Sequence, residues 1–553
     1  MFRFTTTILF ALFCTLNVYS QARWGSQYLR YAFDRPIDIA SHQTEISLAG
    51  WRGETLYAQL VVLNSTQPEA LYKVELSPVQ GRGGRINAKD IEVGWVDEVI
   101  ADRFSNCGKH DLEAYGRVPS ADRIVPKPYF LLPKGEQRGV WLSIPIPSDA
   151  KPGLYQGSVM VYRENRQIER LRIKIDVKAH LLPEPSHWKF HLDFWQNPYA
   201  IARVHKVTPW SPEHFSAMRP YMERLARSGQ KVITATLIDR PWDGQTYDAF
   251  GSMVEWKRTA SGEWIYDFEI FDKWVEFMHS CGIDREISCF SMIPWKLSFR
   301  YWDEGFDSYQ YWRSAPGQKL YNERWGDFLA RFEQHLREKG WLDKTTISMD
   351  ERSMEQMQEA IKLIRDRAPG LKISMAGNYH PEIEPYLFDY CVDEQSREQY
   401  TPEVINRRRE EGKISTYYTC CSALFPNTFT FSPVAESSFI AWYALRRNLD
   451  GYLRWAYNSW TIDPDYDSRF TAWSSGDTYI VYPNNYASVR WMCLTEGIQQ
   501  FEKYHILMDE AVKKGDTARI KQLEDILRII DKEKLKDGTK EMVEKAQRAL
   551  NSL

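Results

Sequence analysis

The chain has 553 residues and a formal net charge of −3 at pH 7. One hydrophobic core rarely serves so long a chain, so we expect two or three domains. The near-neutral charge gives no support to a nucleic-acid or anionic-membrane partner. Aromatic residues make up 14% of the chain, and such an excess suits a protein that stacks sugar rings on aromatic faces.

The first residues have the pattern of a targeting signal. Arg3 precedes an apolar stretch over residues 8–18, and small residues follow at Ser20 and Ala22. This pattern predicts a signal peptide over residues 1–20, with an apolar stretch too short for a stable membrane span. We therefore expect the mature protein to be secreted via the signal peptide and to be periplasmic or extracellular.

Residues 21–182 have the pattern of an all-β sandwich. Short alternating runs, separated by Gly, Pro and Asn, recur at 54–64, 138–147, 153–163 and 169–180. Such spacing without a long helical segment is typical of a sandwich. The Pro-rich connector at 181–187 predicts a domain boundary.

From residue 188 onward the sequence alternates between strand and helix patterns. Eight strand candidates occupy residues 188–195, 230–238, 285–293, 344–349, 371–376, 388–392, 413–420 and 451–460. Eight such units over 188–500 predict a (β/α)8 TIM-like barrel. The alternative is a doubly wound open sheet, which normally carries a Gly-rich phosphate turn after its first strand, and the sequence shows no such turn.

Two long loops and a charged tail complete the chain. The loops at 294–320 and 461–487 are rich in aromatic residues and are expected at the carboxyl-terminal face of the barrel, without secondary structure of their own. Residues 501–553 predict a helical segment, packed on the barrel as a hairpin or, alternatively, forming a partner-binding coiled coil.

The eight Cys residues show no metal-ligand spacing. Cys289, Cys391 and Cys420 fall within strand-like runs and are expected to be small buried hydrophobes. Because an exported protein meets an oxidising compartment, a disulfide remains an open alternative. The pair Cys420-Cys421 suggests no mechanism.

Asp350 and Glu351 are the candidate catalytic residues. They end a buried strand at the point where a helix begins, and parallel α/β folds place their chemistry there. Two carboxyl groups held close together can acquire different pKa values and take different roles. The weaker second candidate is Asp393-Glu394, which also ends a strand-like run.

Polar and aromatic residues at the other strand ends are candidate substrate contacts. They are Trp195, Asn378, His380, Tyr417, Tyr418, Trp455, Tyr457, Asn458, Trp460 and Asp477. Carboxylates, amides, phenols and indoles around one pocket suit a sugar. The sequence predicts no cofactor and no metal, since it contains no His pair with zinc spacing, and a Gly-x-Ser-x-Gly nucleophile elbow is also missing.

Two mechanisms of glycoside cleavage fit these residues. A conventional pair of carboxylates on separate strands would combine Glu351 with Asp393 or Glu394. Alternatively, the 2-acetamido oxygen of the substrate attacks its own anomeric carbon. One carboxylate then protonates the leaving oxygen and the other holds the acetamide N–H. Consecutive Asp350 and Glu351 favour this second scheme, because the chain turns at the strand end and can direct both side chains at one sugar.

The chain resembles glycoside hydrolase family 123, the β-N-acetylgalactosaminidases. The strand-end pair Asp350-Glu351 matches the acid pair of that family, and the stretches 451–460, 476–483 and 488–504 resemble its C-terminal signature. The resemblance covers roughly 188–505 and extends to the preceding sandwich. It implies a retaining, substrate-assisted reaction in which Asp350 orients the acetamide and Glu351 is the general acid, then base.

The expected activity is removal of terminal β-linked N-acetylgalactosamine from a glycan. Three alternatives are open: a β-N-acetylhexosaminidase of broader preference, a conventional two-carboxylate glycosidase, and a non-catalytic glycan-binding protein. In each case the expected partner is a glycan, with no nucleic acid and no stable membrane span, and the sequence does not determine the oligomeric state.

Overall fold

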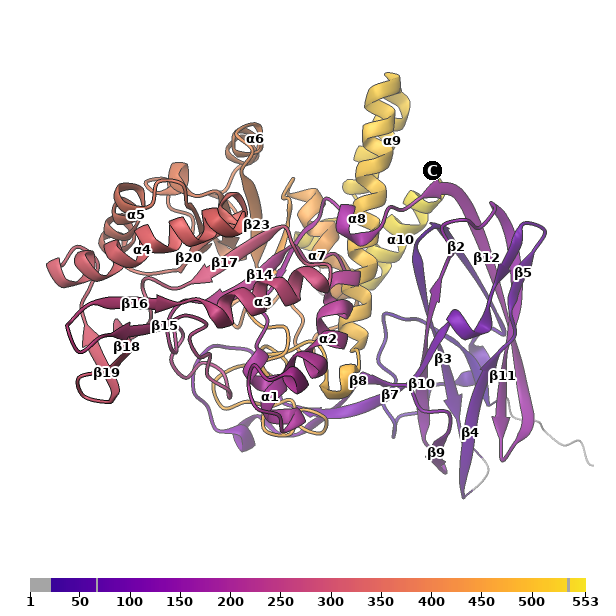
Figure 1. Cartoon of the computed structure of the whole chain (residues 1–553). Helices are drawn as coiled ribbons and strands as arrows, with labels where there is room; N and C mark the ends of the chain where they lie inside the picture. Colours follow the sequence, from indigo (N-terminus) through magenta and orange to yellow (C-terminus); the bar gives the residue numbers. More distant parts are fainter. Residues whose placement is uncertain (1–20, 66–67, 535–537) are drawn as a thin grey trace, which may run out of the picture.

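The computed structural model describes residues 21–65, 68–534 and 538–553. A β-sandwich and a parallel barrel lie side by side, and the C-terminal helices run between them (Figure 1). The predicted signal peptide lies outside the described residues. None of the helices in the described ranges combines the length and apolar character that crossing a bilayer requires.

Two sheets form the sandwich. The first contains, in spatial order, β1 (Ala22–Gly25), β3 (Thr55–Leu63), β10 (Gln137–Pro145), β7 (Glu92–Ala101) and β8 (Val118–Val125). The second contains β2 (Glu45–Arg52), β12 (Arg166–Leu181), β11 (Gly153–Arg163), β4 (Glu69–Leu76) and β9 (Phe130–Pro133), with β5 (Val79–Gly81) and β6 (Gly84–Ile86) attached. Alternate residues such as Leu60, Val62 and Leu142 face the core between the sheets, as the period of two predicts.

Eight parallel strands form the barrel sheet, and their positions confirm the eight predicted strands. They are β13 (His191–Phe194), β14 (Val232–Thr236), β17 (Glu286–Phe290), β20 (Thr345–Asp350), β21 (Lys372–Gly377), β22 (Asp389–Asp393), β23 (Ile414–Tyr418) and β24 (Gly451–Arg454). The sheet order runs from β13 through β24 and down to β14. A parallel bridge between Leu192 and Gln230 brings the two edges together, so the barrel is nearly closed.

The helices around the barrel depart from a regular (β/α)8 pattern. They are α1 (Pro198–His205), α2 (Pro212–Arg227), α3 (Glu269–Ser280), α4 (Lys319–Lys339), α5 (Met354–Arg367), α6 (Pro402–Glu410), α7 (Ala435–Arg446) and α8 (Val489–Lys514). Between β21 and β22, where every residue is described, the chain makes only a 3-10 turn at Glu384–Tyr386. One of the seven crossovers between successive barrel strands therefore lacks an α-helix.

The loop expected at 294–320 is not structureless, and the prediction was wrong there. It forms the hairpin of β18 (Ser298–Asp303) and β19 (Ser308–Arg313), which joins β15 (Glu255–Arg258) and β16 (Trp264–Asp267) in a four-stranded sheet outside the barrel. Phe299 and Trp312 lie opposite each other on the two strands, and their rings stack with centroids 4.1 Å apart.

The barrel interior is polar. Ser348 exchanges hydrogen bonds with Ser288 on one neighbouring strand and with Ser374 on the other, at 2.5 and 2.6 Å between hydroxyl oxygens. On β20 the buried apolar residues Ile347 and Met349 alternate with Ser348 and therefore face the surrounding helices. Asp350 continues the inward-facing column at its carboxyl-terminal end, which directs its side chain into the mouth of the barrel.

The C-terminal segment is helical, as predicted. α8 starts on the barrel at residue 489 and runs without interruption past residue 500 to Lys514, and α9 (Thr517–Leu527) and α10 (Thr539–Asn551) fold back on it. α10 packs on both α7 and α8. The tail thus lies against the barrel, in the position that Figure 1 shows in yellow between the two domains.

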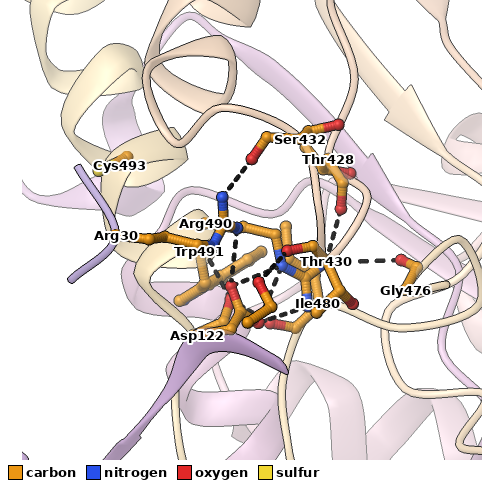
Figure 2. Close-up of polar contacts among 12 residues, drawn as sticks. Arg30, Asp122, Thr428, Thr430, Ser432, Gly476, Ile480, Arg490, Trp491 and Cys493 are labelled. Carbon is orange, nitrogen blue, oxygen red and sulfur yellow. Dashed lines mark hydrogen bonds and ion pairs between the residues drawn. The ribbon is translucent and has the colours of Figure 1, made fainter. Parts of the chain in front are cut away.

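A buried ion pair joins the two domains (Figure 2). Asp122 on β8 accepts hydrogen bonds from Arg490 on α8 at 2.9–3.0 Å and from the Tyr482 hydroxyl at 2.6 Å, and Arg30 lies at 3.2 Å. Burial favours the protonated acid, but Arg490 and Arg30 outweigh it and lower the pKa of Asp122. Arg490 also donates to the carbonyl of Thr428, so the same cluster holds loops of the barrel.

Replacement of Asp122 by Ala is expected to destabilise the protein by about 3–5 kcal/mol, because Arg490 would be left buried without its counter-ion. The midpoint of denaturant unfolding measures the loss. Glu45→Ala is the matched control, since it removes a partly exposed surface partner of Lys174 and Arg172 and should barely move the midpoint. Equal midpoints for both variants would contradict a stabilising role of the buried ion pair between Asp122 and Arg490.

Candidate active site

A cavity of about 220 Å³ opens at the carboxyl-terminal ends of the barrel strands. Three carboxylates and six aromatic rings are among its lining residues. The lining residues are Trp195, Trp242, Gln245, Trp295, Asp350, Glu351, Arg352, Ala376, Tyr418, Cys420, Cys421, Leu453, Trp455, Trp473 and Asp477. The predicted pair Asp350-Glu351 therefore lies in the position where parallel barrels carry their chemistry.

Asp350 lies on the inner wall of this cavity. Its side chain is only 17% exposed and accepts a hydrogen bond of 2.6 Å from the indole Nε1 of Trp242. Arg352 lies 4.0 Å from the same oxygen. Burial raises the pKa of Asp350 to about 6, although Arg352 and Trp242 both act to lower it. The carboxyl group can therefore change its charge at mildly acidic to neutral pH.

Glu351 lies nearer the mouth of the cavity, with 41% of its side chain exposed. Asn378 donates a hydrogen bond of 2.5 Å to its Oε1, and His380 Nε2 lies 3.8 Å from the same atom. Tyr390 fixes the segment after β21 by donating to the carbonyl of Asn378 at 2.6 Å and accepting from the His380 N–H at 2.7 Å. Two consecutive carboxylates therefore have different surroundings, as a division of roles requires.

Asp477 contributes a third carboxylate from the loop at 461–487. Its Oδ1 accepts hydrogen bonds from Arg454 at 2.6 Å and from the Trp455 indole at 3.1 Å. Its Oδ2 is buried and has no hydrogen-bond partner among the described residues. Burial raises the pKa of Asp477, while Arg454 opposes that effect. The carboxylate beside the cavity is thus only partly satisfied by hydrogen bonds.

Aromatic rings form most of the cavity wall. Trp195 stacks on Trp242 with centroids 5.0 Å apart, and Trp455 meets Trp473 edge to face at 5.8 Å. Trp295 stands at the rim with 51% exposure. Flat apolar faces beside a few fixed polar groups are suited to a pyranose, whose C–H face is apolar and whose rim is polar.

The structure brings most of the predicted substrate contacts together. Trp195, Tyr418, Trp455 and Asp477 line the cavity. Asn378 and His380 lie beside Glu351 rather than in the cavity wall.

Four predicted contacts lie elsewhere and are bonded within the core. Tyr417 donates to the Ile440 carbonyl, Tyr457 to that of Tyr221, Trp460 to that of Val481 and Asn458 to that of Asn197. Tyr417 alternates with the inward-facing Tyr418 and so faces α7. The other three follow residue 454, where β24 ends and the strand alternation used to place them stops.

Sequence reasoning missed several lining residues because they come from loops. Trp242 and Gln245 follow β14 without any distinctive pattern. Trp295 and Trp473 belong to the two aromatic loops that were expected at this face. The aromatic content of these loops was the sequence signal that could have identified both residues. Arg352 directly follows the acid pair, and its guanidinium lies 5.1 Å from the Trp295 ring.

The alternative acids at 393–394 do not line the cavity. Glu394 is buried and bonded to Lys532, with the Tyr443 hydroxyl at 3.1 Å and Arg397 at 3.5 Å. It therefore attaches the C-terminal segment to the barrel. Asp393 is buried and accepts from the backbone N–H of Gln395 as a helix cap.

A disulfide between Cys107 and Cys421 connects the sandwich to the cavity wall. Cys421 lines the cavity, while Cys107 follows β7, where the chain pairs with the loop that carries Trp473. The backbone N–H of His110 donates to the carbonyl of Thr471 at 2.9 Å. The sandwich thus supports one wall of the site. Cys289 and Cys391 are free and buried, as predicted, whereas Cys420 is only partly buried and lines the cavity, so that prediction was wrong.

Reduction of this disulfide is expected to lower stability by about 2–4 kcal/mol, because the bond closes a long loop of the chain. It should also raise KM, since the wall with Trp473 loses a support. Thermal unfolding and kinetics with and without dithiothreitol measure both effects. The double variant Cys107→Ser, Cys421→Ser is the control, and a further effect of reductant on that variant would refute the assignment to this bond.

Paired carboxylates in an aromatic cavity, at the carboxyl-terminal end of a parallel barrel, define a glycoside hydrolase. The family model "Glycoside hydrolase 123, catalytic domain" matches residues 195–507, and "Glycoside hydrolase 123 N-terminal domain" matches residues 24–163. The chain belongs to glycoside hydrolase family 123.

A solved structure agrees with this membership. A family 123 glycoside hydrolase from Clostridium perfringens, described in terms of glycolipid glycan hydrolysis, is 25% identical, with a TM-score of 0.85 and 96% of each chain covered. A GH5 xyloglucanase from Bacteroides ovatus is 7% identical, covers 86% of this chain and 99% of its own, and has a TM-score of 0.30, too low to support any argument. No curated protein sequence matches the chain.

Proposed function

We propose that the protein is an exo-acting, retaining β-N-acetylgalactosaminidase that uses the 2-acetamido group of its substrate as the nucleophile. One observation carries the proposal: Asp350 and Glu351 are consecutive and line the same cavity. The remaining carboxylate of the cavity, Asp477, is paired with Arg454. The arrangement supplies an acid and a stabilising carboxylate, and the substrate supplies the nucleophile.

Glu351 gives its proton to the glycosidic oxygen as the bond to the anomeric carbon breaks. The acetamide carbonyl oxygen attacks that carbon and forms an oxazolinium, while ionised Asp350 accepts the acetamide N–H and stabilises the positive charge. Glu351 then removes a proton from the water that attacks the anomeric carbon. The oxazolinium ring opens, and the anomeric carbon ends with the configuration it had in the substrate. Intramolecular attack is favoured by effective molarities on the order of 10⁵–10⁸ M.

The size of the cavity supports exo action. Its volume of about 220 Å³ lies below the ~300–1,000 Å³ of pockets that enclose larger ligands, so it suits one terminal sugar. The C. perfringens relative is described as acting on glycolipid glycans, and we infer that the substrate here is also a glycoconjugate that ends in a β-linked N-acetylhexosamine. We further propose that the enzyme is exported, as the pattern of residues 1–20 predicts.

Release of nitrophenol from β-GalNAc, β-GlcNAc and β-Gal nitrophenyl glycosides, with and without a galacto-configured thiazoline, tests the proposal. We expect cleavage of the β-GalNAc glycoside and inhibition by the thiazoline, which mimics the oxazolinium. Equal cleavage of β-GlcNAc would indicate a broader β-N-acetylhexosaminidase. Cleavage of the plain β-galactoside would overturn acetamide participation in favour of two enzyme carboxylates, and glycan binding without any release would indicate a binding protein.

The pH dependence should report the ionisation of Asp350. Because the pKa of this group is about 6 and its ionised form is required, kcat/KM should fall as the pH drops below about 6. The hydrogen bond from Trp242 lowers the pKa of Asp350. Trp242→Phe should therefore move the acidic limb of the kcat/KM profile to higher pH. An unchanged limb in Trp242→Phe would show that another group controls it.

A further inference from the structure

A second buried cluster of ligating side chains lies at the opposite end of the barrel. His191, Glu286 and Asp389 are the first residues of β13, β17 and β22, and each is less than 10% exposed. Trp195 follows the end of β13, four residues after His191, so the cluster lies roughly 13 Å below the active-site cavity. The catalytic scheme uses none of its members.

The geometry of the cluster approaches that of a metal site. His191 Nε2 lies 3.0 Å from Asp389 Oδ2 and 4.0 Å from Glu286 Oε2, and one ligating atom from each residue lies within 4.8 Å of the others. Ligand atoms bound to one tetrahedral zinc ion at ~2.0–2.2 Å are about 3.3–3.5 Å apart. The measured contacts of 3.0 and 4.0 Å differ from this spacing by less than an ångström, so small side-chain shifts would bring them to it.

Unpaired oxygens point to a ligand in the same place. Glu286 Oε2 and Asp389 Oδ1 are buried and have no hydrogen-bond partner among the described residues. The same is true of Asp193 Oδ1, which belongs to a neighbouring carboxylate. Glu286 uses only its Oε1, which accepts from Thr346 at 3.1 Å. Unpartnered buried carboxylate oxygens are costly, so they call for an additional group.

The charge balance of the cluster also favours a cation. The strongest charges acting on Glu286 are those of Asp389, His191 and Asp193, which gives three carboxylates for one imidazole. We propose that His191, Glu286 and Asp389 bind a structural divalent transition-metal ion, with zinc as the ion that best suits one imidazole and two carboxylates. The nearby carboxylate of Asp193 completes the negative surroundings.

A route to the outside exists but is electropositive. His191 and Glu286 line a cavity of about 760 Å³ at the amino-terminal end of the barrel. Lys231, Arg285 and Lys344 lie on its wall. Since this wall repels cations, we expect the ion to be captured during folding and to leave slowly when a chelator is added.

The rival interpretation is a cluster that shares protons instead of binding an ion. Burial and the neighbouring carboxylates raise the pKa of Glu286, so without a cation this group would hold a proton near neutral pH. The two interpretations differ in the expected effect of Glu286→Gln. Loss of a metal ligand destabilises the fold, whereas replacement of a protonated acid by its neutral isostere leaves stability unchanged or increases it.

Metal analysis of the whole protein, purified without an affinity metal column or chelator, tests the proposal. We expect about one equivalent of zinc per chain, its loss in Glu286→Gln together with a lower Tm, and visible absorption from Co²⁺ after refolding with that ion. His505→Gln is the matched control, since His505 lines the same cavity outside the cluster and should retain the metal. Two results together would overturn the metal site. The wild-type protein would contain no metal and refold equally well with and without Zn²⁺, and Glu286→Gln would have an unchanged Tm.

Discussion

Replacement of Glu351 by Gln is expected to lower kcat/KM for an oligosaccharide substrate by about 10²–10⁴, the usual contribution of a general acid. Gln has the same shape and can remain bonded to Asn378, so only the transferable proton is lost. A nitrophenyl glycoside should suffer less, because nitrophenolate departs with little protonation. Rates on both substrate types measure this difference, and a wild-type rate on the oligosaccharide would refute the assignment.

The matched control for Glu351→Gln is Asp393→Asn. Asp393 also ends a barrel strand, and it would be the nucleophile of a conventional mechanism with Glu351 as the acid. Because it does not line the cavity, its replacement should cost far less activity. A collapse of activity in Asp393→Asn with a folded protein would instead establish the two-carboxylate scheme.

The sequence predicted the part of the fold that depends on local periodicity. Each of the eight barrel strands lies within a predicted run or within one residue of it, and the acid pair was found because a strand end is a local signal. The 294–320 segment was misjudged as structureless because its strands pair with strands from another part of the chain, which a local pattern does not reveal. In the structure this segment forms a hairpin whose partner strands come from residues 255–267.

What the sequence could not give is the set of contacts between distant segments. The disulfide joins Cys107 to Cys421 across 314 residues, and no spacing rule predicts such a pair. The cluster of His191, Glu286 and Asp389 likewise assembles from three strands, so a search for closely spaced ligands overlooks it. The prediction that Tyr457 and Trp460 line the cavity was wrong, because strand alternation was extended six residues beyond the end of β24.

Replacement of Asp350 by Asn is expected to lower kcat by about 10²–10³, because a neutral amide cannot stabilise the positive charge of the oxazolinium. Affinity for the thiazoline should fall together with kcat. Azide should not restore activity with formation of an inverted glycosyl azide, since no enzyme nucleophile has been removed. Formation of that azide product would show that Asp350 attacks the sugar directly.

The stability of the same variant separates a catalytic role from a structural one. The pKa of Asp350 is raised to about 6 in the folded protein, so its ionisation costs stability. The cost develops as the pH rises from the unfolded value near ~3.9 towards 6 and is complete above it, at most about 3 kcal/mol. Asn avoids this cost and can still accept the Trp242 hydrogen bond. Asp350→Asn should therefore have an equal or higher Tm at pH 7 while losing activity, as expected of a carboxylate kept buried for its chemistry. A lower Tm would instead assign Asp350 a structural role.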